Sequence, residues 1–141
     1  MTQFSQPQVA LVTGSSRGIG AAIASQLRAR GVRVIGHATR SVDADTIAAD
    51  LTDPTAAARI WEEALERSGG TIDLLVNNAG VFAPNPIAAS DIAWLDTWED
   101  GLRINLTAAA ELTRFALRHW LDRASPGRRV HIASHAGAED Q

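Results

Sequence analysis

The sequence predicts an α/β fold: a doubly wound parallel sheet of five strands with helices on both faces, in three layers. Short apolar runs alternate with longer amphipathic segments, and glycine or proline marks most of the boundaries between them. Strands that are joined through helices pair in parallel, with right-handed crossovers. The alternation therefore predicts one sheet with a helical layer on each side.

The first elements are a strand, a helix and a second strand. Val9–Thr13 is an apolar run that ends at glycine, as a buried strand does. Arg17–Arg30 carries isoleucine or leucine at every fourth position, which is the spacing of one helix face, and Gly31 supplies its C-terminal stop. Val32–Ala38 is the second predicted strand.

A short third strand, a helix and a fourth strand follow. Too few residues precede Thr46–Ala49 for a crossover helix, so we expect a turn or a single helical turn before this strand. Asp53 is a predicted N-cap with proline at the first helical position, and the helix runs to about Ser68 before a Gly-Gly pair. Ile72–Val76 is the fourth predicted strand.

The last third of the chain predicts a long helix and a fifth strand. Val81–Ser90 contains two prolines and is expected to be a loop. Asp91 is expected to cap a short helical piece, and apolar residues at helical spacing predict a separate long helix over Trp98–Arg123. Val130–Ser134 is the fifth predicted strand.

Composition excludes several classes of function. The 141 residues suffice for one domain, and a formal charge of −3 without a basic run does not indicate binding to nucleic acid or to a membrane surface. The sequence has no membrane-spanning apolar stretch and no signal peptide, so a cytoplasmic location is the default expectation. The absence of cysteine excludes disulfides and thiolate chemistry, and the four histidines lack metal-ligand spacing, so no metal is expected.

The residues GSSRGIG, from Gly14 to Gly20, have the chemistry of a phosphate-binding loop between the first strand and helix. Backbone N–H groups at a helix start and the helix dipole attract anions, and glycine allows a phosphate to approach the backbone closely. The spacing differs from the G-x-G-x-x-G dinucleotide fingerprint. Taken alone, the loop is also explained by a tight turn that binds nothing.

Polar clusters follow all five predicted strands, and their positions favour a ligand site. These clusters are Gly14–Arg17, His37–Arg40, Asp50, Asn77–Gly80 and Ser134. Ligands of open α/β sheets bind beyond the carboxyl ends of the strands, where the strand order reverses. The clusters therefore predict a dinucleotide site at that edge.

Five motifs occur together in the order typical of one family: TGSSRGIG, DLTD, NNAG, WEDGLRINL around Asn105 and VHIASHAG around Ser134. The sequence resembles the short-chain dehydrogenase/reductase family, most closely its 3-oxoacyl-(acyl-carrier-protein) reductase branch. The resemblance implies hydride transfer between a nicotinamide cofactor and a carbonyl or alcohol of a small-molecule substrate, with 3-oxoacyl thioesters as one candidate. It also implies a homo-oligomer, a dimer or tetramer formed through the long helix.

The resemblance assigns roles by position. It implies that Ser134 donates a hydrogen bond to the substrate oxygen, that Asn105 holds a water in a proton relay, and that Thr13 braces the NNAG turn. The implied cofactor-binding residues are Gly14, Ser15, Ser16, Arg17, Gly18, Ile19, Gly20, His37, Arg40, Asp50, Leu51, Asn78, Ala79 and Gly80. Structural alternatives remain: a buried kink residue with a locally satisfied amide for Asn105, turn chemistry for Asn77 and Asn78, a strand end for Ser134 and a capping carboxylate for Asp50.

The residues after the second strand favour NADP(H) over NAD(H). A carboxylate there binds the ribose 2′-hydroxyl of NAD, whereas arginine accommodates the 2′-phosphate of NADP. No acid ends this strand, Arg40 follows it, and Arg17 lies in the glycine loop. Asp43 and Asp45 come slightly later and reverse this preference if the turn folds back.

A Tyr-x-x-x-Lys pair follows the serine in the family, with tyrosine as the proton donor and lysine lowering its pKa. The sequence contains no tyrosine. We therefore expect residues 1–141 to form a Rossmann-type dinucleotide-binding domain that is incomplete at its C-terminus, truncated after the fifth strand and inactive alone. The alternative is a naturally short, non-catalytic nucleotide-binding or assembly protein. An exposed parallel edge strand predicts instability or self-association.

Overall fold

The five strands all pair in parallel, in the order β3-β2-β1-β4-β5. The computed structural model describes residues 5–40 and 43–134. The strands are β1 (Val9–Val12), β2 (Arg33–Ala38), β3 (Thr46–Ala48), β4 (Leu74–Asn77) and β5 (Arg128–His131). The chain builds outward from β1 through β2 to β3, then crosses to the other side for β4 and β5. The strand order therefore reverses between β1 and β4, as the doubly wound prediction requires.

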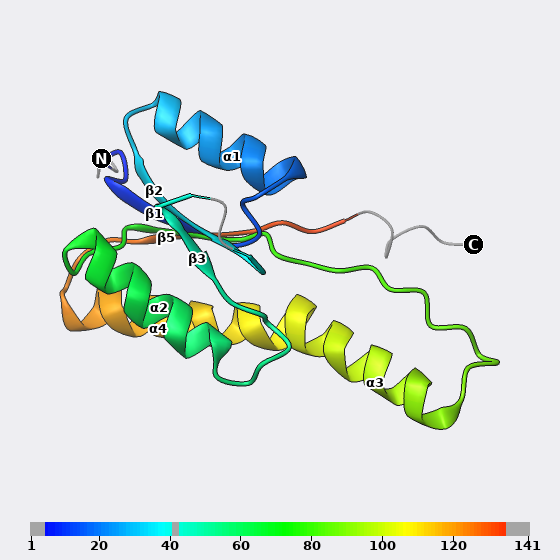
Figure 1. The fold of residues 1–141 in the computed structure, drawn as a ribbon. Helices are drawn as coiled ribbons and strands as arrows, with labels where there is room; N and C mark the ends of the chain where they lie inside the picture. The colour runs from blue at the N-terminus through cyan, green and yellow to red at the C-terminus, as the bar shows by residue number, and fades with distance from the viewer. Residues whose placement is uncertain (1–4, 41–42, 135–141) are drawn as a thin grey trace.

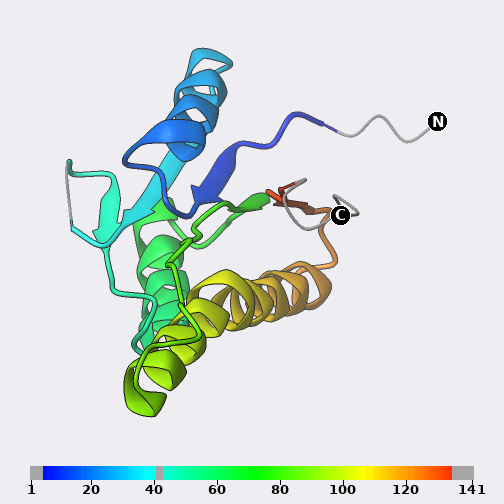
Figure 2. The ribbon, with the colours of Figure 1, turned by 90° about the vertical axis from the view of Figure 1, so that its right-hand side faces the viewer.

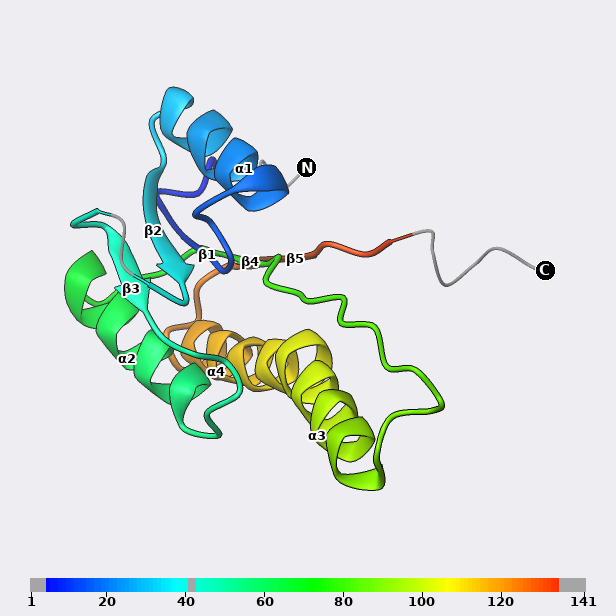
Figure 3. The same ribbon diagram turned by 45° about the vertical axis from the view of Figure 1, so that its right-hand side comes forward.

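Helices cover both faces of the sheet, which confirms the three predicted layers. One face carries α1 (Gly18–Ala29), and the other carries α2 (Ala56–Ser68) and α4 (Ala108–Asp122), as Figure 1 and the rotated view in Figure 2 show. The remaining helix, α3 (Asp91–Leu102), continues the line of α4 away from the sheet, and the loop before it extends in the same direction (Figure 3).

Two apolar clusters fill the spaces between these layers. Successive strand residues point to opposite faces, so Leu11 and Leu75 pack toward α2 and α4, while Val12 and Val76 pack toward α1. The side facing α2 and α4 also contains a buried polar contact, in which the Trp120 indole N–H donates to a backbone carbonyl over 2.8 Å. The inner strands β1 and β4 are therefore packed on both faces.

The long helical segment differs from the prediction. It begins at Asp91 and runs without interruption to Asp122, through a π turn, η1 (Arg103–Thr107). The N-cap is Ser90, whose hydroxyl accepts a hydrogen bond from the Ala93 N–H over 3.3 Å, rather than the predicted Asp91. The expected break before Trp98 was wrong, because α3 runs unbroken through Trp98 to Leu102 and continues through the π turn into α4.

Other boundaries also move, among them the end of the fifth strand and the start of α2. The fifth strand ends at His131 rather than Ser134, because its partner β4 ends at Asn77, whose carbonyl accepts the last ladder bond from Ile132. Helix α2 starts at Ala56, later than the Asp53 N-cap predicts. The edge strand β5 is exposed along its whole length, as expected for the edge of the sheet.

Candidate functional site

A cleft of about 360 Å³ opens beyond the carboxyl ends of β1, β2 and β4, at the reversal of strand order. Most of the predicted cofactor-binding residues line it: Gly14, Ser16, Arg17, Gly18, Ile19, His37, Asp50, Leu51, Asn78, Ala79 and Gly80. Four further lining residues were not predicted: Ala38, Thr39, Val81 and Ile104. Ala38 and Thr39 sit between the predicted His37 and Arg40, so the end of the second strand was the signal that could have found them.

The Gly14 peptide lies at the base of the cleft and is held from two sides. Its N–H donates to Nδ1 of His37 over 3.2 Å, and its carbonyl accepts from Nδ2 of Asn78 over 3.0 Å. The residue has a left-handed φ of +63°, and a Cβ there would lie 2.9 Å from Cα of Ala79. Only glycine fits this position, which leaves the backbone open to a ligand.

The Thr13 hydroxyl organises the turn after β4. This buried side chain accepts hydrogen bonds from the backbone N–H groups of Asn78 and Ala79, each over 3.0 Å. The Asn78 amide returns a bond to the Thr13 carbonyl over 3.1 Å. These contacts confirm the predicted brace between the end of β1 and the NNAG turn.

Ser15 and Gly20 support the loop from outside the lining of the cleft. The Ser15 hydroxyl accepts from the His37 N–H over 3.1 Å, and the Ser15 N–H donates to the His37 carbonyl over 2.8 Å. Gly20 is buried under Gly14, and a Cβ there would come within 2.0 Å of the Gly14 carbonyl oxygen. Both residues shape the loop, and their direct contact with a cofactor stays a prediction.

The first turn of α1 offers a site for an anion. Its N-cap, Arg17, is extended and provides no side-chain cap, and no acidic residue lies in the first turn. The first N–H groups of a helix lack partners within the helix, and its dipole adds positive potential there. Ser16 and Arg17 are exposed and line the cleft beside these N–H groups.

His37 lies below the cleft and is 3% exposed. Its Nδ1 faces Gly14, and its Nε2 lies 2.9 Å from the Ala49 carbonyl oxygen. Burial lowers the pKa of His37 below 6.5 because it disfavours the charged ring, and the Ala49 carbonyl offsets part of this effect.

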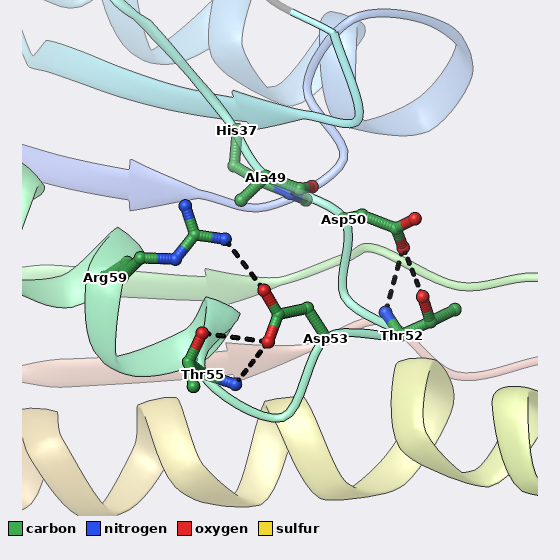
Figure 4. Close-up of polar contacts among 7 residues, drawn as sticks. All are labelled: His37, Ala49, Asp50, Thr52, Asp53, Thr55 and Arg59. Carbon is green, nitrogen blue, oxygen red and sulfur yellow. Dashed lines mark hydrogen bonds and ion pairs between the residues drawn. The ribbon is translucent and has the colours of Figure 1, made fainter.

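Asp50 lines the cleft and also caps a turn. Its carboxylate accepts from the Thr52 N–H over 2.9 Å and from the Thr52 hydroxyl over 2.8 Å, as Figure 4 shows. These bonds to the charged form lower the pKa of Asp50. Asp53 makes the same pair of contacts with Thr55 and a 3.2 Å ion pair with Arg59. The capping alternative for Asp50 is therefore confirmed, and its contact with a cofactor stays a prediction.

Asn105 lies inside the π turn, where its side chain holds the loop after β4. The amide oxygen accepts from the Val81 N–H over 2.7 Å, and the amide nitrogen donates to the Val81 carbonyl over 2.9 Å. The alternative of a locally satisfied amide is wrong, because both hydrogen bonds are to Val81, 24 residues away. The predicted water-holding role is not tested by these contacts.

Arg40 and Ser134, like Ser15, Gly20 and Asn105, are not among the residues that line the cleft. Ser134 is exposed and follows the end of β5, and Arg40 is exposed and follows β2. Their assigned roles stay predictions. In the described part of the chain, no three His, Cys, Asp or Glu side chains gather as a metal site would require. Over the same residues, no helix has the length and apolar character needed to span a bilayer.

Comparison with known proteins shows which family the chain resembles. The family model described as short chain dehydrogenase matches residues 8–141. The 3-oxoacyl-[acyl-carrier-protein] reductase FabG of Haemophilus influenzae is 35% identical over 144 residues, which cover 94% of this chain and 57% of that protein. A short-chain dehydrogenase structure from Streptomyces avermitilis aligns with a TM-score of 0.77 at 33% identity, covering 94% of this chain and 51% of that one.

A 4-hydroxyisoleucine dehydrogenase complexed with NADH has the same fold, with a TM-score of 0.80 at 23% identity over 95% of this chain and 59% of that one. The chain spans little more than half the length of the relatives it matches. The glycine loop, the strand order and the match over residues 8–141 agree on one conclusion. The chain belongs to the short-chain dehydrogenase family.

Proposed function

We propose that the chain binds a nicotinamide dinucleotide, NADP(H) in preference to NAD(H), and is the cofactor-binding part of a carbonyl reductase or alcohol dehydrogenase. The observation that carries this proposal is the Gly14 peptide, held by His37 and Asn78 at the uncapped start of α1. Its glycines let a ligand approach the backbone, and the first N–H groups of α1 have no partner within the helix, which together fit a pyrophosphate.

The other walls of the cleft fit the remaining parts of the cofactor. Asp50 and Leu51 flank the adenine in this proposal, and Asn78, Ala79 and Gly80 lie along the nicotinamide ribose. When bound, the cofactor supplies or accepts a hydride at its nicotinamide ring. The protein's own contribution is to hold that ring against the substrate, which converts a bimolecular reaction into a positioned one.

Charge around the end of β2 supports NADP(H). Arg17 lines the cleft, and no carboxylate from the β2–β3 connection is among the described lining residues. The Asp43 carboxylate instead accepts from the Asp45 N–H over 2.9 Å and from the Thr46 hydroxyl over 2.8 Å. Since the β2–β3 connection places no acid among the described lining residues, the Arg17 guanidinium is assigned to the 2′-phosphate in this proposal.

A carbonyl or secondary-alcohol substrate, with 3-oxoacyl thioesters as the first class to test, follows from similarity to the 3-oxoacyl-[acyl-carrier-protein] reductase. In this proposal Ser134 donates a hydrogen bond to the substrate oxygen and polarises the carbonyl. The sequence contains no tyrosine, so the proposal assigns proton donation to no residue of these 141.

Self-association is part of the proposal. Exposed apolar side chains recur at helical spacing on the outer face of α3 and η1: Ile92, Leu95, Trp98, Leu102 and Leu106. Exposed apolar stripes of this kind support an interface between copies. Sedimentation analysis of the wild type and Trp98→Glu tests this point, with dissociation expected in the variant.

Binding measurements test the cofactor assignment. NADPH and NADH are titrated into the wild type, Arg17→Ala, Arg40→Ala and Arg33→Ala, with ligand fluorescence as the readout. Arg17→Ala should weaken NADPH binding by about tenfold or more, since a charge-assisted hydrogen bond contributes about 1.5–3 kcal/mol, and should leave NADH nearly unchanged. Arg33, exposed at the start of β2, is the matched control. An unchanged ratio of NADPH to NADH affinity in Arg17→Ala would refute the phosphate assignment.

Turnover is tested on the full-length protein that the gene encodes. Assays with NADPH, a ketone panel and 3-oxoacyl thioesters distinguish a reductase from a nucleotide-binding protein without catalysis. Reduction that disappears in Ser134→Ala would support the assigned role. Nucleotide binding without turnover by the complete product would favour the non-catalytic alternative.

A further inference from the structure

The His37 ring connects three segments that meet below the cleft. It extends from β2, contacts Gly14 after β1 through Nδ1, and contacts Ala49 after β3 through Nε2. The backbone of His37 also pairs with Ser15 in both directions. One side chain therefore ties the glycine loop to the segment that carries Asp50, and Figure 4 shows the ring beside Ala49.

The partners of the ring determine its protonation state. The Gly14 N–H can only donate, so Nδ1 must accept and carry no proton. The Ala49 carbonyl can only accept, so Nε2 must carry the hydrogen. The geometry therefore selects the neutral ring protonated at Nε2.

A second proton on the ring would break this arrangement. It would put an N–H at Nδ1 against the Gly14 N–H, two donors at a part-buried contact without an acceptor between them. Gly14 is the residue whose backbone must stay open toward a pyrophosphate. Displacement of its peptide therefore alters the base of the cleft.

Charged groups on the neighbouring elements are engaged elsewhere. Arg17 lies at the mouth of the cleft, and the carboxylates of Asp50 and Asp53 are held by threonines, with Arg59 of α2 paired to Asp53. Among the described residues, none of these groups hydrogen-bonds to the His37 ring. No neighbouring carboxylate is therefore placed to stabilise its charged form.

We propose that His37 is a positioning residue that sets the pH range of cofactor binding, because only its neutral ring holds the Gly14 peptide in the binding geometry. This inference rests on the proposed function, in which the cleft binds a nicotinamide dinucleotide. His37 contacts the loop and acts through it.

The burial of the His37 ring determines how cofactor binding changes with pH. Since the pKa of His37 in the folded chain lies below 6.5, binding is fully present near neutral pH and weakens as pH falls through that lower value. One linked proton weakens binding by up to about tenfold per pH unit below this value. The free energy of unfolding also decreases as pH falls, because His37 takes up its proton at a higher pH in the unfolded chain than in the folded one.

The experiment measures the dissociation constants of NADH and NADPH between pH 8 and 5 for the wild type, His37→Asn, His37→Val and His119→Gln. NADH is the primary probe because the 2′-phosphate of NADPH itself titrates, with a pKa of about 6 expected from other phosphomonoesters. His37→Asn keeps a neutral acceptor for Gly14, so its NADH affinity should change much less between pH 8 and 5 than that of the wild type. His37→Val should bind weakly at every pH, and His119→Gln, remote from the cleft, should keep the wild-type profile.

Nitrogen-15 NMR of the imidazole tests the ring directly, with the Nε2-protonated tautomer expected at pH 8 and titration below 6.5. Circular dichroism at each pH defines the range in which the chain is folded. A flat NADH profile in the wild type, a profile retained in His37→Asn, or weakening that merely tracks unfolding would overturn the role of His37. Failure of the wild type to bind either nucleotide at pH 8 would instead overturn the proposed function, and this inference with it.

Discussion

Replacement of Thr13 by valine removes one hydroxyl from the centre of the site and changes little else. Valine has nearly the same shape as threonine, so the side chain still fills its buried position at the end of β1. The Asn78 and Ala79 N–H groups, however, lose the oxygen that accepts both of them. We expect Thr13→Val to destabilise the fold and to loosen the turn that forms one wall of the cleft.

The magnitude follows from the two donors. A buried N–H left without an acceptor costs about 1–3 kcal/mol, and these two residues are half-buried, so water compensates in part. The low end of that range, applied to each of the two N–H groups, lowers the free energy of unfolding by about 2–3 kcal/mol. Since m in urea is about 1–3 kcal/mol per molar for small proteins, the unfolding midpoint should fall by about 1 M or more.

Urea unfolding followed by circular dichroism, at one fixed protein concentration, measures the loss. Thr13→Ser keeps the hydroxyl and loses only a methyl group, so it should cost about 1 kcal/mol. Thr97→Val is the matched control, because the Thr97 hydroxyl bonds to the Ala93 carbonyl of its own helix and should change stability by less than about 0.5 kcal/mol. The reasoning is wrong if Thr13→Val lies within about 0.5 kcal/mol of wild type, or if Thr13→Ser is equally damaging.

Three further predictions follow from single contacts. Gly20→Ala should lower the melting temperature and abolish nucleotide binding together, because its Cβ would lie 2.0 Å from the Gly14 carbonyl oxygen; a variant that binds normally contradicts this. Asn105→Ala should speed hydrogen exchange at the Val81 N–H, measured by NMR, and equal rates would show that the amide does not hold the loop. Hydrogen bonds from Thr52 lower the pKa of Asp50 below 3.8, so its carboxylate stabilises the fold at pH values above 3.8, and this stability is lost as pH falls through the pKa of the folded state. Asp50→Asn should therefore flatten the dependence of the unfolding free energy on pH between pH 5 and 3. An unchanged dependence on pH would contradict this.

The order of strands and helices was predictable because each element carries its own pattern. Apolar runs bounded by glycine identify strands such as Val9–Thr13 within a residue of β1. The π turn at Arg103–Thr107 was not predictable in this way, because apolar residues at helical spacing predict a helix without distinguishing an α turn from a π turn. The end of β5 was also misplaced, since it depends on where its partner β4 stops and not on its own apolar residues.

The location of the candidate site was predictable from the sequence, but the role of each residue within it was less so. Motif positions identified most of the residues that line the cleft, because polar residues after parallel strands converge at one edge. They did not separate Arg17, which faces the cleft, from Ser15, whose hydroxyl bonds to β2. That distinction depends on a partner 22 residues away, which no local pattern encodes.

The residues that suit the glycine loop to an anion are adjacent in the sequence, but the contacts that fix the shape of the loop come from other strands. The glycines allow the turn, yet the Gly14 peptide is held by His37 from β2 on one side and by Asn78 from the end of β4 on the other. Those two strands are the neighbours of β1 in the sheet, so the loop acquires its binding geometry only when the strand order is complete around it. Preorganisation of this kind reduces the entropy lost on binding, because the backbone groups that meet the ligand are already fixed. The doubly wound order therefore does more than place the loop at an edge: it supplies, from two separate strands, the side chains that make the loop rigid.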